Sequence, residues 1–294
     1  MNNFELNNLL GNAKTLISDG ATGTNLIARG LGRGETAEHW VLNKPQEIVK
    51  LHHDFIAAGS DIILTSTFGG SEIRLKHAGL HDQFTKVNTS AVKIAREAVA
   101  GTEVLVAGSL GPLGEMLIPL GCLEIDDAKR YYAEQAKILV DAGVDLLIVE
   151  TQFDINEAQA AIEGIRSASD IGLICSFSFD RGTKTMMGVS PEKFANAVSA
   201  FDLSALGINC GKSLADNLQC LSQLSDATDL PIWFKPNAGL PELDADGHAI
   251  YNLSPEEMGE SAKNWPAKGA KIIGGCCGTS TEHRLKIAEA VREE

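Results

Sequence analysis

The chain has 294 residues, of which 44% are hydrophobic and 22% are charged, and its formal net charge is −14. This hydrophobic content allows a sizeable core and is not typical of a disordered chain. The negative charge disfavours nucleic acids and anionic membrane surfaces as partners, because both would repel it. We therefore expect a folded protein that binds neither nucleic acid nor membrane.

The N-terminal sequence lacks the basic segment and apolar run of a secretory signal, and no apolar stretch reaches the ~20 residues that span a bilayer. There are six cysteines, two of them adjacent, which is not the pattern of a small disulfide-rich secreted protein. We expect a cytoplasmic protein whose thiols are free to bind a metal or take part in catalysis.

Taken in chain order, eight short apolar runs alternate with segments of helical length. The expected strands are Thr15–Asp19, Asp61–Thr67, Val104–Ser109, Leu146–Thr151, Leu173–Phe179, Ala205–Cys210, Pro231–Asn237 and Lys271–Cys277. The expected helices are 45–58, 84–100, 126–142, 154–168, 191–200, 214–227, 254–265 and 281–293. The strands are almost continuously apolar, as expected when both faces of a parallel sheet are covered.

A weak repeat supports this organisation. The segments AAGSDIIL (57–64), DAGVDLLI (141–148) and AKGAKIIG (267–274) each place a glycine shortly before an expected strand. A glycine there can end a helix in the left-handed conformation and allow a short turn into the sheet. Eight such units in 294 residues predict the α/β class and a single (β/α)8 TIM barrel domain over residues 1–294. A doubly wound open sheet is the alternative.

Three cysteines stand at the ends of neighbouring strands of the predicted barrel. Cys210 ends the sixth strand, Cys276 and Cys277 end the eighth, and only the seventh strand lies between them. Since the carboxyl ends of barrel strands surround one mouth, the three sulfurs could converge. Three thiolates favour zinc and leave its fourth tetrahedral position open. A substrate thiol in that position would become a thiolate at neutral pH, so no protein side chain is needed as a general base.

Other polar groups at the same mouth suit an amino-acid substrate. Asp19 and Glu150 end the first and fourth expected strands and could bind an ammonium group, although each could instead cap a helix or pair within the rim. The backbone N–H groups of Gly20 and Ala21 could receive a carboxylate. Asn209 is expected to orient the substrate or the neighbouring cysteine, with a simple turn role as the alternative.

Five segments resemble the homocysteine S-methyltransferase family: SDGATGTN (18–25), AGSDIILTSTFG (58–69), VETQFD (149–154), GINC (207–210) and GGCCG (274–278). The similarity runs nearly end to end, and the GINC and GGCCG segments are its most specific part. It implies one zinc ion per chain bound by Cys210, Cys276 and Cys277. It also implies that carboxylates such as Asp19 and Glu150 hold homocysteine, and that methionine is the product.

The methyl donor stays open between betaine, dimethylsulfoniopropionate, S-methylmethionine and methylcobalamin on a separate corrinoid protein, with a small onium compound favoured. Onium groups bind well against aromatic rings. Trp40 and Phe68 flank the second expected strand and are the candidates for that contact, with ordinary loop packing as the favoured alternative for Trp40. The sequence ends soon after Gly278, so we expect no cobalamin-binding module in this chain.

Two interpretations from other functional classes remain. One is a binding module with a structural zinc ion, which would need a fourth protein ligand. The other is a redox protein with a disulfide between Cys276 and Cys277, which would give Cys210 no role. The zinc content before and after reduction would separate them.

Overall fold

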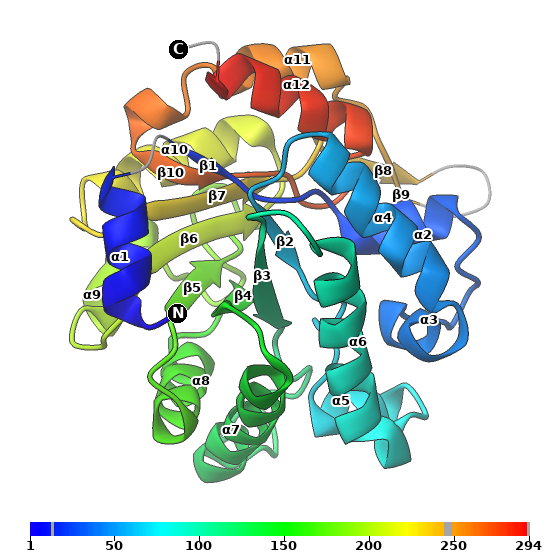
Figure 1. The fold of residues 1–294 in the computed structure, drawn as a ribbon. Coiled ribbons are helices and arrows are strands. Elements are labelled where there is room, and N and C mark those ends of the chain that lie inside the picture. Colours follow the sequence, from blue (N-terminus) through cyan, green and yellow to red (C-terminus); the bar gives the residue numbers. More distant parts are fainter. Residues whose placement is uncertain (13–14, 244–248, 293–294) are drawn as a thin grey trace.

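Eight parallel strands form one sheet in the computed structural model, which describes residues 1–12, 15–243 and 249–292 (Figure 1). The strands are β1 (Leu16–Ile17), β2 (Ile62–Leu64), β3 (Leu105–Leu110), β4 (Leu146–Gln152), β5 (Leu173–Phe177), β6 (Ala205–Cys210), β7 (Ile232–Pro236) and β10 (Ala270–Ile273). Their order is β1-β10-β7-β6-β5-β4-β3-β2. A parallel bridge between Ser18 and Ile62 and the hydrogen bond from Asp61 N to Ile17 O (2.7 Å) join the first strand to the second. This near-closure confirms the predicted barrel, because an open sheet would leave two edge strands.

The helices that follow the barrel strands cover the outside of the sheet (Figure 1). They are α4 (Pro45–Ala57), α6 (Phe84–Ala98), α7 (Ile125–Ala142), α8 (Ile155–Ala168), α9 (Pro191–Val198), α10 (Leu214–Ser225), α11 (Pro255–Ala262) and α12 (Thr281–Arg292). Their starts are set by local chemistry: Ser190, Ser213 and Ser254 each accept a hydrogen bond from a first-turn N–H group. The expected helices therefore coincide closely with the observed ones.

Several short elements were not predicted. They are α1 (Asn3–Asn12), α2 (Thr22–Ala28), α3 (Ala37–Asn43), α5 (Glu72–His77), the 3-10 turns η1 (His81–Gln83) and η2 (Pro266–Lys268), and a hairpin of β8 (Pro241–Leu243) and β9 (Ala249–Tyr251). Helices α2, α3 and α5 and the hairpin lie in connections that follow barrel strands. Connections of this kind carry the functional residues of (β/α)8 barrels.

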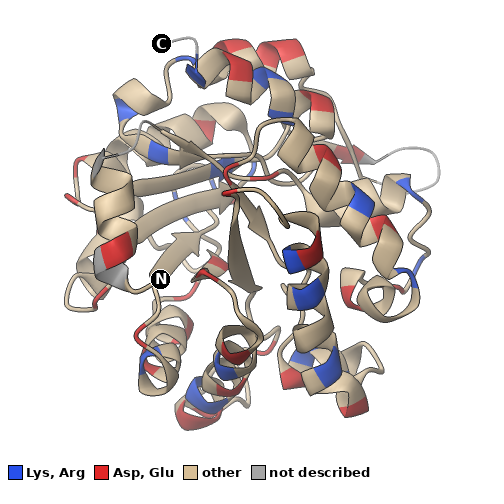
Figure 2. Ribbon diagram, viewed as in Figure 1, with Lys and Arg blue, Asp and Glu red and all other residues tan. Residues whose placement is uncertain are grey.

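Two apolar layers hold the barrel together. Ile62, Leu146, Ile148 and Trp233 pack inside the barrel with Leu6 of α1, while the alternate strand residues pack against the outer helices. Most charged positions lie on helices and loops rather than on the strands (Figure 2).

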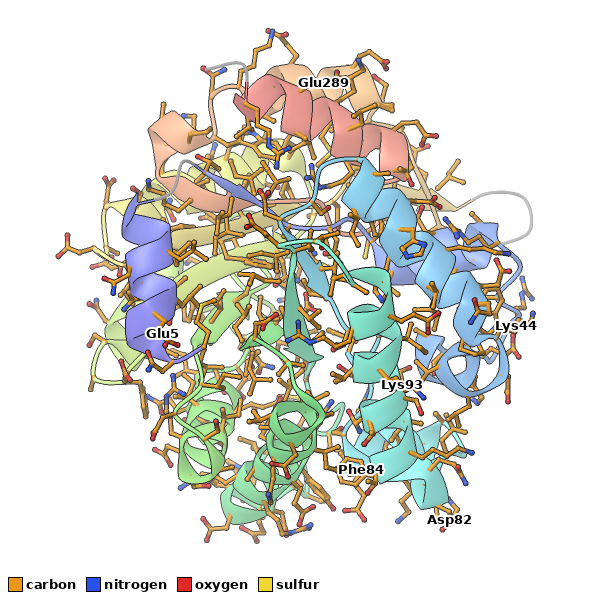
Figure 3. All side chains as sticks on the ribbon, viewed as in Figure 1. Glu5, Lys44, Asp82, Phe84, Lys93 and Glu289 are labelled. Carbon is orange, nitrogen blue, oxygen red and sulfur yellow. The ribbon has the colours of Figure 1, made fainter. Side chains whose placement is uncertain are left out.

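The labelled charged side chains in Figure 3 lie at the outer surface: Glu5, Lys44, Asp82, Lys93 and Glu289. Among the described residues, no helix combines the length and the apolar character that crossing a bilayer requires.

Candidate metal and substrate site

The structure brings together the sulfurs of Cys210, Cys276 and Cys277. Cys210 ends β6, the other two follow β10, and β7 pairs with both strands. The Cys210 Sγ lies 3.0 Å from the Cys276 Sγ and 3.8 Å from the Cys277 Sγ, and all three atoms are within 4.8 Å of one another. Tetrahedral zinc with Zn–S bonds of ~2.3 Å would space its sulfurs by about 3.8 Å. The Cys210–Cys277 spacing therefore matches a tetrahedral thiolate site, whereas the Cys210 and Cys276 sulfurs would have to move slightly apart.

These thiols cannot all ionise without a cation between them. Hydrogen bonds to Cys276 and Cys277, together with burial, raise the pKa of Cys210 well above its usual value. Hydrogen bonds from the Cys210 and Cys276 thiols lower the pKa of Cys277 to about 3. The protein alone thus favours a thiolate at Cys277 supported by its neighbours. A soft dication would replace the shared protons and allow three thiolates.

Backbone strain is concentrated beside this cluster. Thr151 (φ 62°) and Cys210 (φ 58°) are the non-glycine residues with positive φ in the described part of the chain. Asn209 joins them: its Oδ1 accepts from Thr151 N (2.9 Å), and its Nδ2 donates to Thr151 Oγ1 (2.7 Å). Positive φ angles at non-glycine residues persist only where neighbouring contacts stabilise them. The buried Asn209 side chain supplies such contacts by linking β4 to β6. It does not line the cavity described below.

Two residues near the cluster were not singled out from the sequence. Asn237 follows β7, and its Oδ1 is buried without a hydrogen-bond partner while its Nδ2 donates to Gly211 O (2.8 Å). An unpaired amide oxygen between the cysteine-bearing strands is a candidate for a further ligand. The Tyr251 ring of the hairpin packs directly on Gly278 (φ 80°), where no side chain would fit. The hairpin therefore helps to fix the cysteine loop.

A cavity of about 660 Å³ opens above the three sulfurs. Of the residues proposed from the sequence, seven line it: Gly20, Ala21, Phe68, Glu150, Cys210, Cys276 and Cys277. The Ala21 N–H already donates to Thr279 Oγ1 (3.1 Å), whereas the Gly20 N–H has no partner among the described residues. The free N–H of Gly20 is thus the better carboxylate donor.

Of the two carboxylates proposed from the sequence, Glu150 is the one that lines the cavity. It is 7% exposed, and its Oε1 accepts a short hydrogen bond from Ser109 Oγ. Burial raises the pKa of Glu150 to about 7, although the nearby Lys235 ammonium opposes this shift. An ammonium group bound in the cavity would complete the charge balance of this carboxylate.

The position of Asp19 differs from the expectation that its carboxylate contacts the ammonium group of the substrate. It is fully buried: its Oδ1 accepts from Lys235 Nζ (2.6 Å) and its Oδ2 accepts from Leu64 N (2.8 Å). Its side chain is therefore already engaged on both oxygens and does not line the cavity. The alternative, pairing within the barrel rim, describes its position.

Trp40 likewise does not face the cavity, which corrects the expectation of a donor contact. It is 1% exposed and packs with Leu26 and Phe55 in an apolar cluster, because the apolar face of α3 turns towards α4. The Lys44 ammonium lies 4.3 Å from the centre of its ring. Phe68 is 37% exposed and does line the cavity.

Comparison with known proteins bears directly on this arrangement. A family model described as homocysteine S-methyltransferase matches residues 16–291. The chain belongs to this family. It is 30% identical over 295 residues to the methionine synthase of Mycobacterium tuberculosis (strain ATCC 25618 / H37Rv), a match that covers 95% of the chain and 25% of that protein. The chain thus spans about a quarter of the length of this relative.

A solved structure of a homocysteine methyltransferase is also similar to this chain. The metallated form of the homocysteine methyltransferase MmuM from Escherichia coli superimposes with a TM-score of 0.81 and 25% identity, covering 97% of this chain and 99% of that one. A dihydrodipicolinate synthase from Agrobacterium tumefaciens str. C58 (TM-score 0.52, 14% identity, 97% and 80% covered) shares the fold alone. A metallated relative and a three-sulfur cluster together indicate that this family member has a metal site.

Proposed function

We propose that this chain transfers a methyl group from an activated donor to the sulfur of homocysteine and so forms methionine. The observation that carries the proposal is the three-sulfur cluster at the floor of a cavity that also contains Glu150. Cys210, Cys276 and Cys277 would hold one zinc ion. When bound, zinc would supply the positive charge that lowers the pKa of the substrate thiol from its usual ~8.5.

The residues of the chain would orient homocysteine above that site. The Glu150 carboxylate would accept hydrogen bonds from the substrate ammonium, and the free Gly20 N–H would donate to its carboxylate. The Lys235 ammonium, 3% exposed, offsets part of the negative charge that the thiolates and carboxylates place there. These contacts would direct the substrate sulfur towards the cysteines.

The transfer itself is a displacement at the methyl carbon. The substrate thiolate would attack that carbon in line, the bond between the methyl group and the donor would break, and the electron pair would stay with the donor. No proton leaves the substrate in this step, so the chain does not need a general base. Its role is to position both reactants and exclude water.

For the donor we favour a small onium compound such as betaine or dimethylsulfoniopropionate, with S-methylmethionine as a less favoured alternative. Methylcobalamin on a separate corrinoid protein is the second candidate, favoured by the similarity to a methionine synthase. The six cysteines are all free, which suits a reducing compartment, and we infer a cytoplasmic location.

A donor screen tests the proposal. The zinc-loaded chain is mixed with homocysteine and with each of the four donors in turn, and methionine is measured, with Cys210→Ala as the inactive control. We expect methionine from at least one donor with the unmodified chain only. Absence of methionine with every donor, while zinc and homocysteine are bound, would contradict methyl transfer.

A further inference from the structure

Three side chains that line the cavity bring charge and an aromatic ring to it. They are Glu38 of α3, Phe68 in the connection after β2, and Arg74 of α5. Helices α3 and α5 lie on the same, right-hand side of the barrel in Figure 1. Together these residues bring one carboxylate, one aromatic ring and one guanidinium group to the cavity that holds the three sulfurs.

Glu38 is a buried carboxylate with one free oxygen. It is 4% exposed, and its Oε1 accepts a hydrogen bond from Gly69 N (2.7 Å). Its Oε2 has no hydrogen-bond partner within the described residues. Because Glu38 lines the cavity, this oxygen is available to a cation bound there. Phe68 precedes Gly69 in the chain, and its ring face is a second attractive surface for an onium cation.

Arg74 supplies the opposite charge. Its guanidinium makes no hydrogen bond or ion pair within the part of the chain that the structure describes. Its Nη1 packs beside Gly114, where a Cβ would lie only 2.8 Å away. The buried Glu157 carboxylate lies near enough for burial's upward shift of its pKa to be partly opposed by the Arg74 charge, but its Oε1 accepts from Leu113 N (2.7 Å) and Tyr132 Oη (2.9 Å) and it forms no ion pair with Arg74 among the described residues. A guanidinium of this kind matches a carboxylate in charge and shape.

We propose that Glu38, Phe68 and Arg74 form the methyl-donor subsite and select a small onium compound that carries a carboxylate. This inference rests on the proposed function. The cation binds between Glu38 and Phe68, and the carboxylate binds Arg74. On transfer, the methyl–sulfur bond to homocysteine forms and the methyl–onium bond breaks with its electron pair left on the donor. The donor thereby loses its positive charge and its attraction to Glu38, which favours product release.

The test compares donors that differ in the carboxylate alone. With the zinc-loaded chain and saturating homocysteine, kcat/KM is measured for dimethylsulfoniopropionate against ethyldimethylsulfonium, and for betaine against tetramethylammonium. The unmodified chain should prefer the carboxylate-bearing member of the active pair by about tenfold or more, the effect of a charged hydrogen bond. Arg74→Met should abolish this preference without slowing the carboxylate-free donor. Arg74→Lys should keep part of it.

Matched variants separate a local effect from a general one. Lys76→Met removes an exposed charge from the same helix and should leave the preference unchanged. Glu38→Gln should raise KM for both members of a pair by a similar factor. Zinc content, homocysteine affinity and melting temperature should be unchanged in the Arg74 variants.

Four outcomes would overturn the inference. A carboxylate preference that persists in Arg74→Met removes Arg74 from the subsite, and equal use of both donors by the unmodified chain removes the preference itself. Methionine formed from methylcobalamin alone would overturn the subsite but leave the proposed function standing. Absence of methionine with all donors would overturn both.

Discussion

Three thiolates within 4.8 Å of one another are stable only with a cation between them. Replacing Cys210, Cys276 or Cys277 by alanine should therefore remove most of the bound zinc, because two thiolates form a much weaker site. Metal content after gel filtration measures this. Cys122→Ala removes an exposed thiol and should keep one zinc per chain. Full zinc occupancy in Cys210→Ala would show that the ligands lie elsewhere.

Glu150 is expected to hold the ammonium group of homocysteine. Glu150→Gln removes the negative charge but little volume, so homocysteine affinity should fall by about 10- to 100-fold, the range for a charged hydrogen bond. Calorimetric titration of zinc-loaded protein measures this, and zinc content should not change. Glu97→Gln alters an exposed glutamate and should have no effect. Equal homocysteine affinity in Glu150→Gln and the unmodified chain would assign Glu150 a structural role.

The raised pKa of Glu150 also predicts how stability depends on pH. Burial raises this pKa from 4.5 to about 7 in the folded, metal-free protein. The folded chain therefore keeps a proton that the unfolded chain releases. The bound proton therefore stabilises the folded chain fully below pH 4.5, and this stabilisation is lost as pH rises to about 7. We therefore compare the melting temperature of Glu150→Gln with that of the unmodified chain at two pH values. The difference in favour of the variant should be larger at pH 8 than at pH 5. An equal difference at both pH values would contradict the shift.

At the scale of elements, Asp19 and Lys235 connect the first barrel strand to β7 across β10. Both side chains are nearly fully buried, at 1% and 4% exposure. Lys235→Met should destabilise the chain by about 3–5 kcal/mol, because it leaves a buried carboxylate unpaired. Asp19→Asn in the same chain should recover much of this loss. Urea denaturation gives the free energies of unfolding.

The surface pair of Lys137 and Asp141 is the control for that experiment. Lys137→Met should change the free energy of unfolding by only about 0–1 kcal/mol, because exposed ion pairs contribute little. If Lys235→Met costs no more than this, or if Asp19→Asn adds to its cost, the buried pair does not stabilise the barrel.

The long elements of the barrel could be predicted because their patterns repeat. Continuous apolar runs followed by amphipathic segments mark the strands and helices such as α7 (Ile125–Ala142), whose apolar face repeats over several turns. Helices α2, α3 and α5 span only six or seven residues and are too short to show such a repeat. Glu38 and Arg74 lie in two of these helices, so no sequence pattern indicates that they line the cavity.

At the scale of the whole molecule, the cysteines could be placed from strand order alone, since Cys210 ends β6, Cys276 and Cys277 follow β10 by a few residues, and the barrel brings those strand ends together. The ion pair of Asp19 could not be predicted, because its partner Lys235 is 216 residues away in the sequence. From the sequence alone, either carboxylate oxygen could equally have faced a substrate. The choice between a donor contact and packing for Trp40 could not be made for a similar reason, since its burial depends on how α3 packs against α4. Residues at strand ends are thus predictable in position, whereas their partners depend on contacts across the barrel.

The most direct test of the proposed chemistry is the coordination of zinc with homocysteine present and no methyl donor. Zinc-edge X-ray absorption should show three sulfur ligands become four. Below the thiol pKa, mixing in weak buffer should release close to one proton per site, because the thiol binds as a thiolate. Methionine, which has no thiol proton, should release almost none. A zinc shell that keeps a light-atom ligand at saturating homocysteine, with no proton released, would contradict activation of the substrate sulfur by the metal.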